Sequence, residues 1–196
     1  TGFKYIGELI TNLEAEGKAD DFVMGFEESY GYLAGTHARD KDAVVASMLI
    51  CEMAAYYKTK NMNLVDVMNS LYDEYGYYAN DVESYTFEGA AGMEKMAEIM
   101  DNLRQNPPKQ IGGLAVTAMS DYDSGTTVHT DGRTETIDLP KSNVIAFALT
   151  DGNKVIVRPS GTEPKIKAYI TAIGSDRKSA DDLAKVLVSA ASEFMK

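Results

Sequence analysis

The sequence predicts an α/β domain followed by an α+β domain. Apolar residues at helical spacing dominate residues 1–78, whereas short β-rich runs separated by turns dominate residues 79–196. A chain of 196 residues is long enough for two small domains that each bury a core. Because the strands of the second part follow one another through short connections, we expect a mostly antiparallel sheet there, with helices on one side.

The first part predicts three helices and one strand. Four apolar residues near the start recur at helical spacing. Residues 22–26 form an apolar run that predicts a short buried strand. Residues 43–58 are apolar almost all round, so we expect a helix that packs on several sides. A further helix over residues 64–75 starts at the cap residue Asn63 and stops at Gly76.

The second part predicts several strands, which lie at residues 82–87, 114–119, 144–149, 154–157 and 165–173. The pair Asp151-Gly152 signals a two-residue hairpin between the third and fourth of them. The turn-rich residues 120–132 are expected to be mobile.

Two amphipathic helices complete this part. The first carries Met93, Met96, Met100 and Leu103 and stops before two prolines. The second closes the chain, with a capping box formed by Ser179 and Asp182. Its expected buried face consists of Leu183, Val186, Leu187, Ala190 and Phe194.

Charge and cysteine content exclude several classes of function. The net charge is −11, from 30 acidic and 19 basic residues, which disfavours nucleic acid and anionic membranes as partners. Cys51 is the only cysteine, so there is no disulfide framework and no thiolate zinc site. Because it lies in an apolar helical pattern, we expect a buried, inert thiol. We find no signal peptide and no apolar run that spans a bilayer, which predicts a cytoplasmic protein.

A tight loop between two β-rich runs offers groups that bind phosphate. Arg158 supplies a guanidinium fork and Lys165 an ammonium. Ser160 and Thr162 add hydroxyls, and Gly161 lets backbone N–H groups turn toward an anion. The alternative is a hairpin turn with incidental basic residues, since Ser, Gly, Thr and Pro are common in turns. We favour phosphate binding.

A polar loop follows the strand predicted at residues 22–26. Glu27, Glu28 and Ser29 lie at the expected C-terminal end of that strand, where ligands collect in α/β sheets. A carboxylate can accept two O–H bonds from neighbouring sugar hydroxyls. A solvated acidic turn explains the local sequence equally well.

The charged loop at residues 35–42 precedes a predicted helix, for which an Asp provides a cap. Arg39 and Lys41 either meet a ligand phosphate or belong to a solvated helix start. His37 and His129 are the two histidines, and we expect both to be structural.

Two of these loops resemble motifs of one family. Residues 25–31, Gly-Phe-Glu-Glu-Ser-Tyr-Gly, resemble the sugar-binding loop of the α-D-phosphohexomutases. Residues 158–165, Arg-Pro-Ser-Gly-Thr-Glu-Pro-Lys, resemble the phosphate-binding loop in the fourth domain of that family. The order and separation of the loops, and the residues between them, are most similar to the bacterial phosphoglucomutase/phosphomannomutase branch. The resemblance covers the whole chain.

The resemblance implies where the domains lie and which residues bind substrate. Residues 1–78 correspond to the C-terminal part of domain 3, an incomplete three-layer α/β domain, and residues 79–196 to domain 4. Glu27 and Ser29 would hold the O3 and O4 hydroxyls of the sugar. The phosphate that is not reacting would be held by Arg158, Ser160, Gly161 and Thr162. Additional phosphate contacts are expected from Arg39, Lys41 and Lys165.

The family transfers a phosphoryl group between the C1 and C6 oxygens of a hexose through a bisphosphorylated sugar. Such transfer needs a phosphoserine and a metal, which the family carries in domains 1 and 2 and whose motifs do not occur here. The resemblance therefore implies a C-terminal fragment that has no catalytic residue or metal ligand, binds no cofactor and is inactive alone. Its parent would use Mg²⁺ and hexose 1,6-bisphosphate, and its partners would be a sugar phosphate and the missing domains 1 and 2.

Two alternatives belong to other functional classes. The chain could be a stand-alone, non-catalytic module that binds sugar phosphates, or a structural α+β domain whose loops bind nothing. The choice among glucose, mannose and other sugar phosphates is open, because nothing in these loops reads the C2 position.

Overall fold

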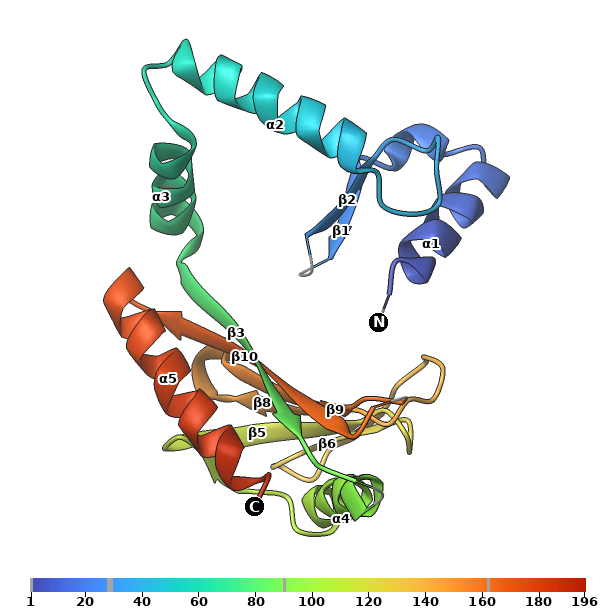
Figure 1. Ribbon diagram of the computed structural model, residues 1–196, viewed down its shortest axis with the longest axis vertical. Helices are drawn as coiled ribbons and strands as arrows, with labels where there is room; N and C mark the ends of the chain where they lie inside the picture. Colours follow the sequence, from blue (N-terminus) through green and yellow to red (C-terminus); the bar gives the residue numbers. More distant parts are fainter. Residues whose placement is uncertain (1, 28–29, 90, 162) are drawn as a thin grey trace. The chain divides into compact units, whose positions relative to one another are not determined.

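The computed structural model describes residues 2–27, 30–89, 91–161 and 163–196. The chain divides into two compact units, Thr1–Ser70 and Leu71–Lys196, each with a hydrophobic core of its own. The division falls within helix α3 (Leu64–Tyr75), a short distance before the boundary expected between residues 78 and 79. Figure 1 traces both units by colour along the chain.

The first unit contains helices and one hairpin. Helix α1 (Lys4–Ala15) and the single turn η1 (Ala19–Asp21) precede strands β1 (Met24–Glu27) and β2 (Gly31–Ala34), and helix α2 (Ala43–Lys58) follows. Strands β1 and β2 pair antiparallel. The core of this unit is small and consists of Phe3, Ile10, Phe22 and Leu33. The helices predicted in this part are confirmed.

The strand predicted at residues 22–26 is shorter and less buried than expected. It begins at Met24, and the residues Met24 and Phe26 are 49% and 65% exposed. Its partner β2 forms a two-stranded hairpin with it, and no further strand extends that sheet within the described residues. One face of the hairpin is therefore uncovered, and the prediction of a buried strand is wrong.

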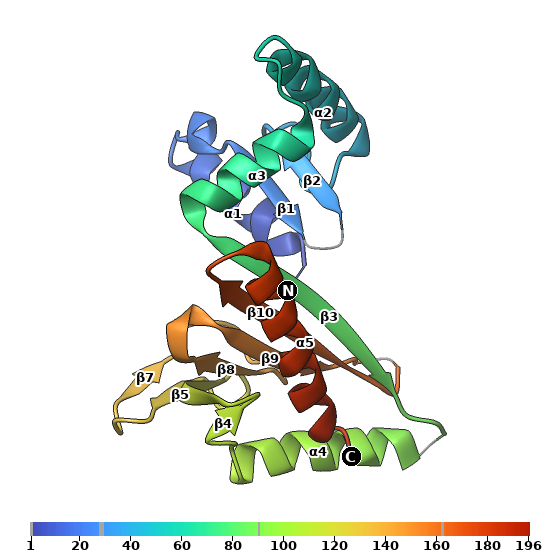
Figure 2. The ribbon, with the colours of Figure 1, turned by 90° about the vertical axis from the view of Figure 1, so that its left-hand side faces the viewer.

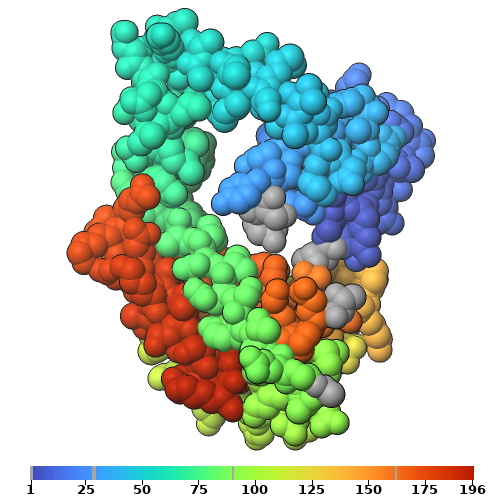
Figure 3. All heavy atoms as spheres, viewed as in Figure 1, coloured from blue at the N-terminus to red at the C-terminus, as the bar shows by residue number. Residues whose placement is uncertain are grey.

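Helix α2 forms over the predicted residues but does not pack on several sides. Among its residues only Val45, Ala46 and Tyr57 are half-buried, while Val44 is 80% exposed. Cys51 is exposed, so the prediction of a buried thiol is wrong. Burial of the apolar residues of α2 would need a covering layer, which the described residues of this unit do not supply, and much of the helix surface is exposed (Figure 3). No helix in the described part of the chain is both long and apolar enough to cross a membrane.

Two polar side chains and one glycine define three helix ends as predicted. Asp42 Oδ1 accepts hydrogen bonds from the N–H groups of Val44 and Val45 at 2.9 and 3.1 Å, which caps α2. Asn63 caps α3 in the same way, at 2.8 and 3.0 Å from two backbone nitrogens. Gly76 has φ +98°, a conformation that glycine adopts without strain, and it ends α3.

The second unit is an antiparallel sheet with two helices. Its strands are β3 (Tyr77–Thr86), β4 (Gln110–Ile111), β5 (Leu114–Asp121), β6 (Thr126–His129), β7 (Thr134–Thr136), β8 (Ile145–Leu149), β9 (Lys154–Pro159) and β10 (Lys165–Gly174). The helices are α4 (Ala91–Gln105) and α5 (Arg177–Glu193). The strand order is β3-β10-β9-β8-β5-β6-β7, with β4 paired to β5, and neighbours run antiparallel. The predicted α+β architecture is confirmed.

The helices cover one face of this sheet. Every second residue of β10 is buried, namely Ile166, Ala168, Ile170 and Ala172. They share a core with residues of both helices, among them Met96, Met100, Leu187 and Ala191. Figure 2 shows α5 lying along β3 and β10, against which it packs. The alternate residues of β10, including Lys165 and Lys167, consequently point to the other face of the sheet.

The connections of this sheet correct the prediction for residues 120–132. Residues 120–132 are not one mobile turn, because β5 runs on to Asp121 and β6 follows, which places His129 in a strand. Strand β8 does not alternate in burial, since Ile145, Ala146 and Phe147 are all buried. It lies in the interior of the sheet, between β5 and β9.

The hairpin predicted at Asp151-Gly152 is confirmed. Asp151 and Gly152 have φ +59° and +78°, the pair of positive values that defines a type I′ turn.

The cap of α5 is one turn earlier than predicted. Asp176 is the N-cap and forms the capping box with Ser179: Ser179 N donates to Asp176 Oδ1 at 2.8 Å, and Asp176 N donates to Ser179 Oγ at 3.1 Å. Asp182 instead pairs with Lys178. On the predicted buried face, Leu187 is fully buried but Val186 is 47% exposed.

Candidate functional site

The loop predicted to bind phosphate, at residues 158–165, connects β9 and β10 in a hairpin. Ser160 N donates to Lys165 O at 2.7 Å, and Lys165 N donates to Glu163 O at 2.7 Å. Glu163 N also donates to the hydroxyl of Ser160 at 3.2 Å. Thr162, a predicted site residue, lies outside the described residues. These bonds join Ser160, Glu163 and Lys165 at the turn, so the polar groups of these three residues are held close together.

Strand register brings three cations to one side of that turn. Arg158 lies directly opposite Lys167, and Lys165 is at the start of β10. Because Val155 and Val157 are buried on the helix side, the side chain of Arg158 points to the other face, with the two lysines. Lys165 Nζ is 3.2 Å from Glu163 Oε2, a partly exposed ion pair.

The hairpin has the chemistry of an anion site. A guanidinium offers two parallel N–H donors and the ammonium groups add point charge, both suited to phosphate oxygens. A side chain at Gly161 would meet no atom within 4 Å, so the backbone of the loop is open at that residue. A ligand can therefore reach the loop backbone there.

The first unit pairs a carboxylate with a lysine. Lys41 Nζ is 3.6 Å from Glu27 Oε2 and 2.8 Å from Asp40 Oδ1. Its side chain crosses Gly31 so closely that a Cβ there would be 2.1 Å from Lys41 Cδ. The hydrogen bond with Asp40, and to a lesser extent the charge of Glu27, raises the pKa of Lys41.

Of two predicted site residues of the first unit, Ser29 and Arg39, the structure describes only Arg39. Ser29 lies outside the described residues. Arg39 is occupied by its own unit: its guanidinium donates to Thr36 O at 2.7 Å and pairs with Glu14 of α1. Its Nε also donates to Thr11 Oγ1 at 3.3 Å. Arg39 thus ties α1 to the loop that precedes α2, and a phosphate contact from it stays a prediction.

The two histidines have polar partners. His37 Nε2 is 2.9 Å from Asp42 Oδ2, the residue that caps α2. His129 Nδ1 is 3.3 Å from an Arg133 nitrogen. His129 Nε2 lies 3.2 Å from Glu135 Oε1, but without the geometry of a hydrogen bond. Both therefore make local contacts within their own units.

Sequence reasoning did not single out three residues of these sites. Asp40 and Gly31 shape the surroundings of Lys41, and Lys167 stands beside Arg158. Strand alternation along β10, counted from Lys165, could have found Lys167. The contact across Gly31 could not be predicted from spacing. Among the described residues no three His, Cys, Asp or Glu side chains converge on a metal position.

These features define a protein of two units, one α/β and one antiparallel α+β, with a hairpin on the second that carries three cations. Family comparison agrees. Residues 1–75 match the model of phosphoglucomutase/phosphomannomutase, alpha/beta/alpha domain III, and residues 94–189 match that of the C-terminal domain of the same family. The chain belongs to the phosphoglucomutase/phosphomannomutase family and contains its domains III and IV, which confirms the predicted fold class.

Individual relatives are longer than this chain. It is 40% identical over 172 residues to a phosphoglucomutase of Staphylococcus aureus strain MSSA476, and 41% identical to that of strain MRSA252. Each match covers 87% of this chain but only 30% of the relative. Among solved structures, the open form of the Paramecium phosphoglucomutase pp63/parafusin has a similar fold, with a TM-score of 0.60 at 20% identity. That match covers 96% of this chain and 33% of the parafusin chain.

Proposed function

We propose that this chain forms the substrate-holding part of a phosphohexose mutase, which interconverts hexose 1-phosphate and hexose 6-phosphate through a bisphosphorylated sugar. The β9–β10 hairpin carries the proposal, because register places Arg158 and Lys167 side by side next to the turn. The turn is held by its own hydrogen bonds before any ligand arrives, which lowers the cost of ordering it on binding.

The residues would act by holding the substrate. Arg158, with Ser160, Gly161 and Thr162, would bind the phosphate that is not being transferred. Glu27 would accept hydrogen bonds from ring hydroxyls, and the hydroxyl of Ser29 would donate to or accept from one of them. Lys41, Lys165 and Arg39 would be additional phosphate contacts, and the position of Lys41 beside Glu27 favours it over Arg39.

The chemical step would depend on groups that the described residues do not offer. A phosphoserine, Mg²⁺ and hexose 1,6-bisphosphate would be supplied by or bound to the larger part of the mutase, and Mg²⁺ would stabilise charge on the transferred phosphoryl group. This chain by itself would bind a sugar phosphate and show no turnover. A cytoplasmic location is part of the same proposal.

Thermal unfolding with and without glucose 1-phosphate tests the proposal. The ligand should raise the Tm of the wild-type chain, and Arg158→Ala should remove most of that rise. Lys154→Ala, at the far end of the same strand, is the matched control and should keep it. An equal rise in Arg158→Ala would contradict the assignment of the phosphate site. Mutase turnover by the purified chain would contradict its inactivity.

A further inference from the structure

A hollow lies within the Leu71–Lys196 unit, between the first half of β3 and the first half of α5. Its volume is about 350 Å³, within the range of small-ligand sites. We call it the α5–β3 trough. Tyr77 at one end of β3 is paired with Gly174, the last residue of β10, whereas the phosphate hairpin lies at the opposite end of β10. The trough is thus separate from the proposed phosphate site.

Small residues make the trough hollow. Ala79 of β3 and Ala180 and Ala184 of α5 all line it. Ala180 and Ala184 are 2% and 5% exposed, so they form a floor against the core. Methyl groups on both walls leave room that longer side chains would fill. The floor that Ala180 and Ala184 form is consequently apolar.

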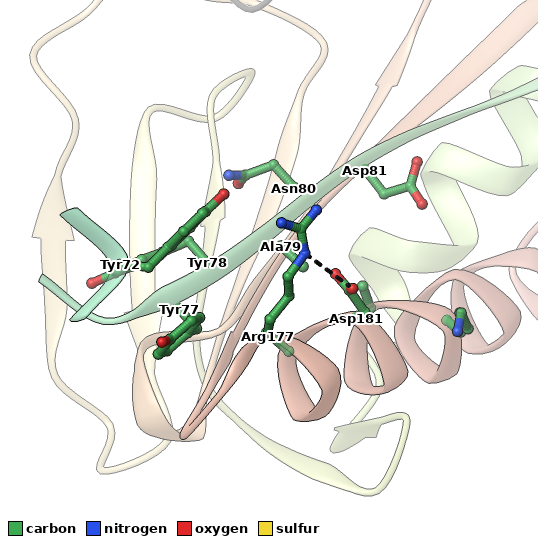
Figure 4. A pocket seen from close by; sticks show the side chains of 11 residues that line it. Tyr72, Tyr77, Tyr78, Ala79, Asn80, Asp81, Arg177 and Asp181 are labelled. Carbon is green, nitrogen blue, oxygen red and sulfur yellow. Dashed lines mark ion pairs between the residues drawn. The ribbon is translucent and has the colours of Figure 1, made fainter. Parts of the chain in front are cut away.

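One rim of the trough is a row of alternating charge. Arg177, Asp181 and Lys185 are spaced four residues apart and so share one face of α5. Their side chains are 71%, 52% and 76% exposed. Figure 4 shows Arg177 reaching from α5 toward β3, with its ion pair to Asp181. Asp81 lines the β3 side.

Aromatic rings close one end. The rings of Tyr72 and Tyr77 are stacked, with centroids 5.4 Å apart and planes 6° from parallel. The Tyr77 hydroxyl bonds to Asp73, which together with burial raises the pKa of Tyr77 above its ordinary value. A stacked pair of neutral rings offers apolar surface for the C–H faces of a ligand.

The charges of the rim decide the class of ligand. Among the lining residues two carboxylates, Asp81 and Asp181, balance two cations, Arg177 and Lys185, so the lining itself gives an anion no net attraction. Lys185 is also 3.3 Å from Asp182, which further reduces attraction for an anion. A ring with many hydroxyls suits such a rim, because each hydroxyl both donates to a carboxylate and accepts from a cation. Its apolar face fits the alanine floor and the tyrosine pair. We propose that the α5–β3 trough binds a neutral pyranose, such as the terminal glucose unit of an oligosaccharide.

Titration with maltose, followed by amide resonances of the 196-residue chain, tests this proposal. Saturable shifts are expected at Tyr77–Asp81 and Arg177–Lys185, with a dissociation constant in the millimolar range. Asp181→Ala and Arg177→Ala should each weaken binding roughly tenfold, the effect of one lost charge-assisted hydrogen bond. Glu193→Ala and Lys178→Ala alter matched charges of α5 outside the trough and should leave the affinity unchanged.

The outcome is independent of the proposed phosphate site. Arg158→Ala should leave maltose binding intact, and this result supports the trough even if glucose 1-phosphate fails to bind. The proposal is overturned if maltose gives no saturable shift, if shifts occur only outside the trough, or if Asp181→Ala binds as the wild type does. Stronger binding of inorganic phosphate or of putrescine than of maltose at these residues would also overturn it.

Discussion

The side chain of Asn153 joins the turn after β8 to strand β10 at Ile173. Asn153 Oδ1 accepts a hydrogen bond from Ile173 N at 2.8 Å, and its Nδ2 donates to Thr150 O at 2.8 Å. Asn153 is 2% exposed, so its amide is buried, while its two partners Thr150 and Ile173 are half-buried. One amide therefore satisfies a donor on the neighbouring strand and an acceptor in its own turn, which sets the spacing between the β8–β9 turn and β10.

Replacing Asn153 should destabilise the second unit. Asn153→Ala leaves the Ile173 N–H buried without a partner, and we expect a loss of about 1–3 kcal/mol in the free energy of unfolding. Urea denaturation measures it. Asn106→Ala, which removes an exposed amide bonded to Asn102, should cost less than about 0.5 kcal/mol. Equal losses in the two variants would show that the Asn153 bonds contribute little.

Asp121 should make stability depend on pH. Burial alone would raise the pKa of Asp121, but the N–H of Asp123, Ser124 and the guanidinium of Arg104 together hold it below its ordinary value of 3.8. Because the folded pKa is depressed, the carboxylate stabilises the fold at neutral pH, and this stability is lost as the pH falls through the folded pKa.

Asp121→Asn tests that linkage. At pH 7 we expect a loss of about 1–3 kcal/mol, since the bonds to a charged acceptor weaken. The difference from wild type should shrink as the pH falls below 3.8, where the wild-type carboxyl also becomes protonated. Urea denaturation at several pH values measures the difference, with Asp123→Asn, an exposed neighbour, as control. A difference that stays constant down to pH 3 would contradict the argument.

The start of α5 distinguishes two capping assignments. Asp176 caps the helix, and the N–H of Ser179 lowers the pKa of Asp176. Asp176→Ala should therefore lower the Tm of the chain more than Asp182→Ala, which removes exposed pairs with Lys178 and Lys185. Circular dichroism on heating compares the two. A larger loss in Asp182→Ala would restore the cap predicted from the sequence.

Sequence patterns located elements well where the cause is local. The caps at Asp42 and Asn63 and the turn at Asp151-Gly152 depend on side chains and φ angles within a few residues, so spacing was sufficient. At α5 the same reasoning chose the wrong pair, because Asp-x-x-Ser caps a helix as well as Ser-x-x-Asp does.

Predictions that depended on distant partners were less accurate. The apolar pattern of α2 called for burial that its own unit does not provide, and Cys51 is exposed as a result. The position of Lys41 over Gly31 joins two segments that spacing does not connect. The tyrosine pair of the α5–β3 trough likewise arises from a helix end and a strand start on either side of Gly76.

The effect of replacing Gly31 on stability should depend on the side chain of Lys41. Gly31→Ala puts a methyl group on the Lys41 side chain and should displace its ammonium from Glu27. In a Lys41→Ala background the same methyl group has room, so the two changes should be non-additive in the midpoint of urea unfolding. Gly161→Ala, where nothing lies within 4 Å, is the control and should add independently to Lys41→Ala. Additive effects of Gly31→Ala and Lys41→Ala would show that the contact is not maintained in solution.

Arg39 and Arg158 are both predicted to contact phosphate, but we expect Arg39 to affect stability and Arg158 to affect ligand binding. Arg39 is held by Glu14, Thr11 and the carbonyl of Thr36, so Arg39→Ala should lower the stability of the first unit by about 1 kcal/mol. Arg158 projects from the uncovered sheet face beside Lys167, and Arg158→Ala relieves like charge, so it should leave stability nearly unchanged. Urea unfolding and the Tm rise with glucose 1-phosphate should therefore respond to different variants. If Arg39→Ala abolished the Tm rise with glucose 1-phosphate without lowering stability, Arg39 would be a ligand contact. Its bonds to Glu14 and Thr36 would then belong only to the ligand-free protein.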